Sequence, residues 1–393
     1  MLAILLDMVY RILSCSDHLF PPRGGGDLSM RFLCRELKSI GHDVHTCYLG
    51  TLSDPEFPSH PLDLKTRARG MWPRQALIHG PWKRRIASLL RRLSPDVVFA
   101  QQTVLFSTIE ACSEVSVPVV SFLHNIDPFC LGSFWNGKPW KCRYKCIGCQ
   151  DAGPRIAQFP FFRKEVARAK RALPHAEAIV ANSPFTQRTL REIWGLESTI
   201  LTPGVEFPSQ RLSLMEDGAV LYFSPVDYKG VDTAISVAEL MEGQRFIFVG
   251  DAKPSVQRKL RELRNVRYHA WTEDLSELWR STKLLMMPSI IPEGYGMVCV
   301  EAMSRGIPCA VSGIGALPET IGDGGDAVPD YHSAQVWAAT IRKYDVLQYL
   351  RAKSSNAIVR AQQERSCHDL SDLLVVMDRA VAGKTSSCSQ AAR

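Results

Sequence analysis

The sequence of 393 residues has no long hydrophobic run and no large excess of charge of one sign. No apolar stretch approaches the roughly 18 residues that a membrane-spanning helix needs. The formal net charge of +7 permits anionic partners but selects none of them. With 46% hydrophobic and 22% charged residues, the composition is that of a globular enzyme, and the length favours two domains.

The N-terminus lacks the marks of a secretory signal peptide. Residues 1–7 are apolar, but no basic flank precedes them and no cleavage site follows. We expect this segment to be an extension or the product of a misassigned start, with Met8 as the natural first residue. Twelve cysteines without a signal peptide predict reduced thiols in a cytoplasmic protein.

One group of cysteines has the spacing of metal ligands. Cys142, Cys146 and Cys149 stand in KCRYKCIGCQ, and Cys130 precedes them. Four thiolates could hold a structural zinc ion tetrahedrally. The sequence has no second Cys-x2-Cys pair, so reduced, half-buried thiols are the alternative interpretation. A further interpretation makes the cluster a functional metal or redox centre.

Short apolar runs typical of buried strands alternate with amphipathic segments along the chain. This alternation predicts parallel α/β sheets, whose ligands bind at the carboxyl ends of the strands. The turn-rich segment 202–208 separates two such series, so we expect domains of residues 1–207 and 208–383 and a disordered tail at 384–393. The expected strands are residues 11–16, 44–48, 96–100, 117–123, 178–181, 198–201, 220–223, 246–249, 266–270, 283–287 and 309–312.

The most distinctive stretch is residues 288–319, PSIIPEGYGMVCVEAMSRGIPCAVSGIGALPE. Its pattern predicts a loop after a buried strand, a helix over residues 297–304 that ends before a Gly-Ile-Pro stop, and a second strand. Glu293 and Glu301 stand eight residues apart in this unit. They could be solvated surface charges, but the neighbouring glycines and the strand–loop–helix context favour a functional pair.

Four other residues fall where such sheets bind ligands. Gly25 and Gly26 lie in a glycine-rich turn before a helix, where free N–H groups can meet a phosphate. Lys229 directly precedes another helix, and His124 ends the strand over residues 117–123. The alternatives are glycines used for loop geometry, a solvated lysine and a structural histidine.

The segment 65–92 is rich in lysine and arginine, and residues 83–93 form an amphipathic pattern. Such a helix can lie on an anionic membrane surface or meet an anionic acceptor. The alternative is a helix packed on the sheet with a solvated basic face. Nucleic-acid binding is not expected, because no recognised nucleic-acid module frames this segment.

In their order, these motifs resemble those of a retaining glycosyltransferase of the GT4 type (glycosyl transferase group 1). The stretch 288–319 is the most specific part. Six further segments support the resemblance: FPPRGGGDLSMRFLCREL, VVSFLHNIDPF, VANSPFTQRTLRE, LTPGVEF, YKGVDTAISVAELM and VRYHAWTEDLSELWRSTKLLMMPS. The resemblance implies a GT-B fold: two doubly wound Rossmann-like domains facing a cleft. The N-terminal domain would be on the acceptor side, with a Cys-containing insertion at residues 128–155, and the C-terminal domain would bind the nucleotide sugar.

The function implied by the resemblance is transfer of a sugar from a nucleotide-diphosphate sugar to a glycan, lipid-linked or small-molecule acceptor. The anomeric configuration would be retained, and neither a metal ion nor another cofactor would be required. The protein would be cytoplasmic or peripheral at the inner face of the membrane. Two other functions stay open: a nucleotide-sugar epimerase with the same fold, and a weakly active or inactive nucleotide-sugar-binding scaffold.

The resemblance also implies roles for residues of the C-terminal half. Glu293 would contact hydroxyls of the donor sugar, and Glu301 the hydroxyls of the ribose. Gly296 and Met297 would offer backbone N–H groups to the sugar or diphosphate. Lys229 would neutralise the departing diphosphate, because negative charge grows there as the sugar leaves.

In the N-terminal half, Gly25 and Gly26 would approach the diphosphate, and His124 would lie near the sugar. One position departs from the family pattern. Family members usually carry an arginine five residues before the lysine, where this sequence has Ser224. Losing one charge-assisted partner would cost about 1.5–3 kcal/mol of diphosphate stabilisation. Arg23 is a candidate to compensate, and Ser224 keeps the scaffold interpretation open.

Overall fold

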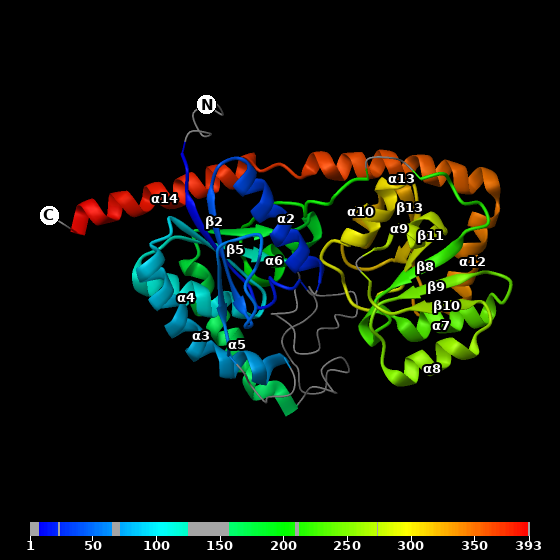
Figure 1. The fold of residues 1–393 in the computed structure, drawn as a ribbon, viewed down its shortest axis with the longest axis horizontal. Helices are drawn as coiled ribbons and strands as arrows, with labels where there is room; N and C mark the ends of the chain where they lie inside the picture. The colour runs from blue at the N-terminus through cyan, green and yellow to red at the C-terminus, as the bar shows by residue number, and fades with distance from the viewer. Residues whose placement is uncertain are drawn as a thin grey trace. The chain divides into compact units, whose positions relative to one another are not determined.

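The computed structural model describes residues 8–22, 24–64, 71–124, 157–208, 212–272 and 274–391. The chain divides into two compact units. Unit 1 consists of Met1–Gly204 together with His368–Arg393, and unit 2 is Val205–Cys367. Each unit is built on one sheet with helices on both of its faces (Figure 1).

Within the described residues, the sheet of unit 1 has the strand order β3-β2-β1-β4-β5-β6-β7, and neighbouring strands are parallel. The strands are β1 (Arg11–Cys15), β2 (Asp43–Leu49), β3 (Ser59–Leu62), β4 (Val97–Gln101), β5 (Val119–Leu123), β6 (Ala178–Ala181) and β7 (Thr199–Ile200). The helices are α2 (Gly25–Ser39), α3 (Met71–Leu93), α4 (Leu105–Val115), α5 (Phe159–Ala172), α6 (Pro184–Trp194) and α14 (Ser371–Ala391).

Both faces of this sheet are buried, because successive side chains of a strand point to opposite faces. Ile12 packs into a core with residues of α2 and α14, whereas Leu13 packs into a core with residues of α3, α4 and α5. Helices α3, α4 and α5 lie on one side of the sheet in Figure 1, and α2 and α14 on the other. The C-terminal helix therefore completes the core of unit 1.

The sheet of unit 2 has the order β10-β9-β8-β11-β12-β13 in the described residues, again with parallel neighbours. Its strands are β8 (Ala219–Phe223), β9 (Phe246–Val249), β10 (Val266–His269), β11 (Thr282–Met287), β12 (Cys309–Ser312) and β13 (Gly325–Val328). Its helices are α7 (Val231–Leu240), α8 (Pro254–Glu262), α9 (Ser276–Arg280), α10 (Met297–Ser304), α11 (Leu317–Ile321), α12 (Ala334–Arg342) and α13 (Leu347–Cys367).

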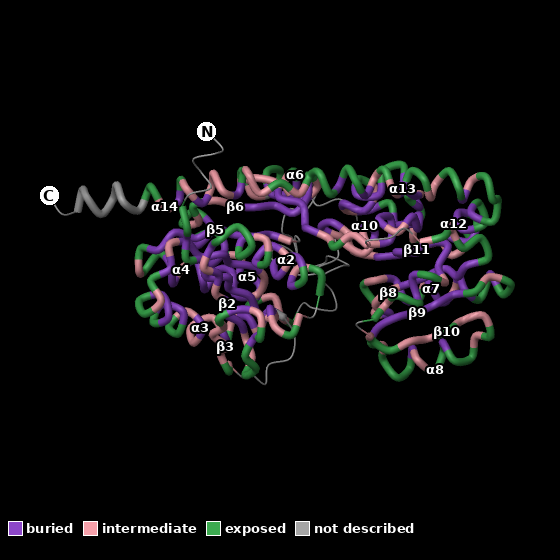
Figure 2. Tube along the Cα trace, turned by 45° about the horizontal axis from the view of Figure 1, so that its top comes forward, coloured by how far each residue is buried: buried purple, intermediate pink, exposed green. Residues whose placement is uncertain are grey.

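Strand β11 lies in the middle of this sheet and is buried along its whole length. Leu284 packs with residues of α7, α8 and α12, and Leu285 packs with residues of α9, α10 and α13. Figure 2 shows β9 and β11 as buried segments in purple. The continuous apolar runs of the sequence therefore arise because each strand is covered on both faces.

The predicted parallel α/β architecture is confirmed. The compact units, however, differ from the predicted domains 1–207 and 208–383: the chain crosses after Gly204, and His368–Arg393 returns to unit 1. The physical reason is that Leu373 and Met377 of α14 are buried in the core of unit 1. Helix α14 runs to Ala391, where the sequence predicted a disordered tail from Lys384. In the described part of the chain, no helix has an apolar stretch long enough to cross a membrane.

Candidate functional site

The loop between β11 and α10, residues 288–296, follows the carboxyl end of a central strand of unit 2 and carries Glu293. Its Oε1 accepts a hydrogen bond from Lys229 Nζ at 2.6 Å and another from Ser289 Oγ at 2.6 Å. Lys229 ends a short 3-10 turn, Asp227–Lys229, just after β8. Unit 2 thus brings together Glu293 and Lys229, two residues that the sequence singled out 64 positions apart.

The Lys229–Glu293 ion pair is partly buried, with side-chain exposures of 22% and 15%. Burial alone would lower the pKa of Lys229, but the charge and hydrogen bond of Glu293 outweigh it and raise the pKa above the ordinary value. Lys229 is therefore a cation at neutral pH. Its ammonium carries three N–H donors and the Glu293 carboxylate carries a second oxygen, so both groups keep capacity for a ligand.

Two glycines let the backbone approach the loop closely. Gly230 has φ +76°, and a Cβ there would lie 1.9 Å from the carbonyl oxygen of Pro288. Gly315 has φ +70°, and a Cβ there would lie 2.6 Å from the backbone nitrogen of Glu293. The backbone N–H of Ala316 donates to Glu293 O at 2.9 Å. The position of the loop 288–296 is thus set at Pro288 and at Glu293 by close backbone approaches that a side chain on Gly230 or Gly315 would block.

Helix α10 begins directly after this loop, with Gly296 at φ +100° as its N-terminal cap and Met297 as its first residue. The first N–H groups of a helix have no intrahelical acceptor and form the positive end of its dipole. Glu301 lies one turn further on and is partly buried. Its pKa is raised to about 7, chiefly by burial. The charge of Arg305 opposes this rise, and the charge of Glu206 adds to it.

Ser224 directly follows β8, at the position where the resemblance implies an arginine. It has φ +60°, a conformation that is uncommon for a residue with a side chain, and its N–H donates to Val249 O at 2.8 Å. Its hydroxyl carries no charge that could replace the guanidinium. Arg23, the candidate to compensate, lies outside the described residues.

In unit 1, Gly26 and His124 are neighbours at the carboxyl edge of the sheet. A Cβ on Gly26 would lie 3.5 Å from His124 Cδ2 and 2.9 Å from Gln102 Nε2. His124 Nε2 hydrogen-bonds to Gln101 Oε1, and Asn182 Nδ2 donates to the carbonyl oxygen of His124 at 2.7 Å. Burial lowers the pKa of His124 to about 4, so the imidazole is neutral at pH 7.

Gly25 is the first residue of α2, so its N–H group lies in a turn that lacks intrahelical acceptors. Gln102 supports this turn: its Nε2 donates to Asp27 Oδ1 at 2.7 Å, and its Oε1 accepts from Ser16 Oγ at 2.9 Å. Gln102 also has φ +56°. The sequence interpretation missed Gln101 and Gln102, although both lie at the carboxyl end of β4, where the fold places its ligand sites.

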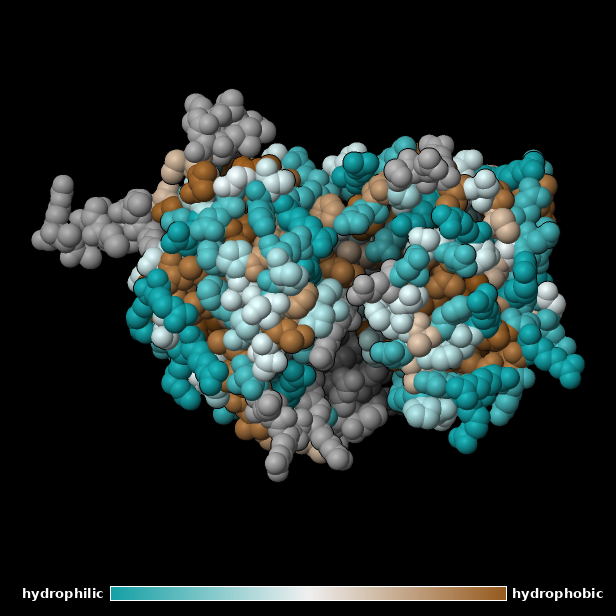
Figure 3. Space-filling model, in the orientation of Figure 1, coloured by the Kyte–Doolittle hydropathy of each residue, from teal (hydrophilic) through white to brown (hydrophobic). Residues whose placement is uncertain are grey.

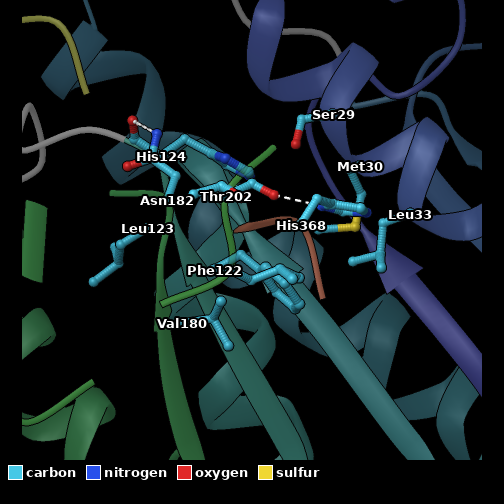
Figure 4. A pocket seen from close by; sticks show the side chains of 11 residues that line it. Ser29, Met30, Leu33, Phe122, Leu123, His124, Val180, Asn182, Thr202 and His368 are labelled. Carbon is cyan, nitrogen blue, oxygen red and sulfur yellow. Dashed lines mark hydrogen bonds between the residues drawn. The ribbon is translucent and has the colours of Figure 1, made fainter. Parts of the chain in front are cut away.

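A small pocket in unit 1 lies beside His124 (Figure 4). On its other side, His368 Nδ1 bonds to Thr202 O at 2.5 Å, and Nε2 bonds to Glu36 Oε2 at 2.6 Å. Because both partners are acceptors, both ring nitrogens must carry hydrogen. Burial alone would lower the pKa of His368, but the bonds to Glu36 and Thr202 raise it above the ordinary value. The sequence did not single out His368.

Among the residues that the structure describes, no three His, Cys, Asp or Glu side chains come together as candidate metal ligands. The predicted cysteine cluster of Cys130, Cys142, Cys146 and Cys149 lies outside those residues. Its zinc and thiol interpretations therefore stay predictions.

Two family models match the chain. The one described as Glycosyltransferase Family 4 matches residues 23–207, and the one described as Glycosyl transferases group 1 matches residues 218–344. The chain belongs to this glycosyltransferase family. Together the two matches cover most of the sequence, including both candidate groups of site residues.

The D-inositol 3-phosphate glycosyltransferase of Mycolicibacterium smegmatis is 34% identical over 112 residues, which are 28% of this chain and 25% of that protein. The chain spans about a quarter of the length of the curated relatives it matches first. Among solved structures, sucrose-phosphate synthase of Thermosynechococcus elongatus has a TM-score of 0.73 at 15% identity, covering 96% of this chain and 100% of that chain. Anabaena HepE in complex with UDP-glucose has a TM-score of 0.65 at 19% identity, covering 96% and 100%. These likenesses show the GT-B fold.

Proposed function

We propose that this glycosyltransferase moves a sugar from a nucleotide-diphosphate sugar to an acceptor, with retention of anomeric configuration and without a divalent metal ion. The observation that carries the proposal is the partly buried Lys229–Glu293 pair, 2.6 Å between Nζ and Oε1, at the carboxyl edge of unit 2. The solved Anabaena relative, which binds UDP-glucose, supports a nucleotide-sugar donor.

Lys229 and the N-terminus of α10 are proposed to hold the diphosphate. As the bond to the sugar breaks, negative charge grows on the leaving diphosphate, and fixed donors aimed at that charge lower the barrier. Lys229 supplies an ammonium, and Gly296 and Met297 supply backbone N–H groups at the positive end of a helix. These groups can do the work that a divalent ion does in other transferases.

Glu293 is proposed to accept hydrogen bonds from hydroxyls of the donor sugar. In the free protein its carboxylate is bonded to Lys229 and Ser289. When the diphosphate takes over Lys229, one carboxylate oxygen becomes available at the same edge of the sheet. The ion pair therefore keeps both groups oriented before the donor arrives, which lowers the cost of ordering them on binding.

For the remaining residues we propose these roles: Glu301 accepts from the ribose hydroxyls, Gly25 and Gly26 offer N–H groups to the diphosphate, and His124 hydrogen-bonds to the sugar. Neutral His124 suits the last role, because one ring nitrogen donates to Gln101 and the other is free to accept from a hydroxyl. The acceptor, whether glycan, lipid-linked or small molecule, is left open.

The first experiment measures donor binding. UDP-, GDP-, ADP- and dTDP-sugars are screened by thermal shift, because a ligand of the folded state raises apparent stability. The best donor is then titrated by calorimetry into Lys229→Ala and into Lys259→Ala, a control at an exposed lysine of α8. Loss of the charge-assisted bonds should weaken binding by about 1.5–3 kcal/mol in Lys229→Ala only. Equal affinity in the two variants would contradict the proposed contact between Lys229 and the diphosphate.

Turnover separates transfer from the alternatives. Transfer to an acceptor panel in the presence of a chelator, with the anomer of the product read by NMR, is the expected result. Binding without hydrolysis or transfer would instead identify a scaffold, an outcome that Ser224 makes worth testing. Epimerised nucleotide sugar would identify an epimerase, which the two matched glycosyltransferase models do not favour.

We further propose that α3 touches an anionic membrane surface. Lys83 is neutralised by Glu114 at 2.7 Å, but Arg84, Arg85, Arg91 and Arg92 are exposed. Helix α5 packs beside α3 and adds four exposed cations, Arg163, Lys164, Lys170 and Arg171. Figure 3 shows hydrophilic side chains over the area of α3.

A flotation experiment tests this contact. The protein should float with vesicles that contain anionic lipid at low salt, and the double variant Arg84→Glu with Arg85→Glu should lower the fraction of protein that floats. Equal recovery with neutral vesicles would contradict it.

A further inference from the structure

Tyr295 lies inside the loop 288–296, yet its side chain is directed into the interior of unit 2. It is 4% exposed, and its hydroxyl donates to Glu364 Oε2 at 2.7 Å. Glu364 belongs to α13, stands 69 positions later and is itself 6% exposed. The bond therefore ties the loop that carries Glu293 to a helix far away in the sequence.

The second carboxylate oxygen of Glu364 is paired with Arg360, one turn earlier on α13. Arg360 also donates to the carbonyl oxygens of Glu319 at 2.7 Å and Thr320 at 3.0 Å, which belong to α11. Thr320 Oγ1 in turn donates to the backbone oxygen of Tyr295 at 2.6 Å. The network closes on itself, because Tyr295 is held both by its hydroxyl and by its carbonyl.

We propose that Tyr295, Glu364 and Arg360 are positioning residues for the donor site: they fix the backbone on which Glu293, Gly296 and Met297 are displayed. This rests on the proposed function. Tyr295 lies two residues after Glu293 and one before Gly296, so any movement of Tyr295 moves the carboxylate and the helix N-terminus together. Electrostatic catalysis requires such groups to be oriented before the substrate binds.

The network is more than ordinary core packing, because the Glu364 carboxylate is buried where an apolar side chain would fill the space at lower cost, whereas the side chain of Arg360 is 26% exposed. Glu364 and Arg360 are paired with each other. Glu364 also accepts from Tyr295 of the loop, and Arg360 donates to α11 and, at 3.2 Å, to Gln363 Oε1 of its own helix. A buried charge that loses one partner is strongly penalised, so such a network favours a single loop conformation.

Unit 2 contains a matched control. Tyr344 is also fully buried, and its hydroxyl donates to Asp326 Oδ2 at 2.6 Å. Asp326 keeps a second partner, Tyr349, if Tyr344 is changed, just as Glu364 keeps Arg360 if Tyr295 is changed. Tyr295→Phe and Tyr344→Phe therefore each remove a hydrogen bond from a buried hydroxyl to a carboxylate, and each leaves that carboxylate with another partner. Only Tyr295 lies in the loop 288–296.

The test compares the two variants by hydrogen–deuterium exchange of the ligand-free protein and by UDP titration. In Tyr295→Phe, peptides that cover residues 289–299 should exchange about tenfold faster and the Kd for UDP should rise about tenfold, as the loss of one hydrogen bond to a charged group predicts. Tyr344→Phe should lower the melting temperature to a similar extent and change neither quantity. Equal loop exchange and equal UDP affinity in the two variants would overturn the proposal.

Glu364→Gln keeps an acceptor for Tyr295 but loses the charge paired with Arg360, so it should show the same changes at reduced size. If Tyr295→Phe does not fold, hydrogen–deuterium exchange of Glu364→Gln replaces it as the test. Exchange of residues 289–299 at the wild-type rate would overturn the proposal, and faster exchange would support it. Failure of the wild-type protein to bind UDP would count against the proposed donor, while the exchange experiment would still read the network directly.

Discussion

Glu301 is the titratable group of the candidate site whose charge changes near neutral pH, because burial raises its pKa to about 7. Ribose hydroxyls are hydrogen-bond donors and prefer the ionised carboxylate. If Glu301 binds them, donor binding must release a proton whenever Glu301 is protonated in the free protein. The affinity for UDP-glucose should therefore rise by up to tenfold per pH unit below about 6 and level off above about 7.

The measurement is calorimetry in buffers of different ionisation enthalpy, which counts the released protons. UDP-glucose is preferable to UDP, because a terminal phosphate titrates near pH 6 and would confuse the profile. In Glu301→Gln the affinity should be lower and nearly independent of pH from 5.5 to 8. A variant that keeps the full pH dependence would remove Glu301 from the ribose site.

At this scale the sequence singled out individual polar residues but not their partners. Glu293 was singled out by its place in the loop after a strand and Lys229 by its place just before a helix, and the structure joins them. Ser289 and Gln102, which follow strand ends, and His368, which lies between α13 and α14, were missed, because a single polar side chain carries no signal until the part of the chain that faces it is known. The roles of the site residues stay proposals.

The helix α10 depends on a single backbone conformation at its start. Gly296 has φ +100°, and a Cβ there would lie 2.6 Å from Leu317 Cδ2. Gly296→Ala should lower the free energy of unfolding by about 1–3 kcal/mol and weaken UDP-glucose binding, because the N–H groups of the first turn are displaced. Gly243→Ala is the control, since nothing lies within 4 Å of its Cβ. Urea unfolding and calorimetry compare the two, and equal results would refute a special role for Gly296.

Elements with a strong pattern were predicted closely: Met297–Ser304, Phe246–Val249 and Ala178–Ala181 have the expected bounds. Two edge strands were not predicted, Ser59–Leu62 of unit 1 and Gly325–Val328 of unit 2. Both have few apolar residues, and their pairing with a neighbouring strand compensates for a weak local pattern. Context of that kind is absent from a short sequence window.

At the scale of the whole molecule, the chain leaves unit 1 after Gly204 and re-enters it at His368. The turn-rich sequence indicated the first crossing to within a few residues. The second could not be predicted, because amphipathic residues of α14 fit any apolar core, and only the structure identifies the core that buries Leu373 and Met377 as that of unit 1. His368, the residue at which the chain re-enters unit 1, is hydrogen-bonded to Thr202 O and Glu36 Oε2. The attachment of α14 to unit 1 therefore includes a side chain that titrates.

His368 should make the stability of unit 1 depend on pH. Its folded pKa is raised above its unfolded value by Glu36 and Thr202 in spite of burial, with a further contribution from Asp369. The stabilisation is therefore complete below the unfolded pKa of about 6.5 and is lost as the pH rises through the folded pKa. His368→Gln should lower the free energy of unfolding by about 1.5–3 kcal/mol at pH 5.5 and by clearly less at pH 9.

The control is His175→Gln, which removes an exposed histidine from the same unit. Urea unfolding of both variants at the two pH values gives the comparison, and the wild-type difference between pH 5.5 and pH 9 corrects for all other groups. Glu36→Gln should reproduce most of the effect of His368→Gln, and the double variant should add little, because each residue acts through the same bond. Additive losses would show that the two side chains stabilise unit 1 independently.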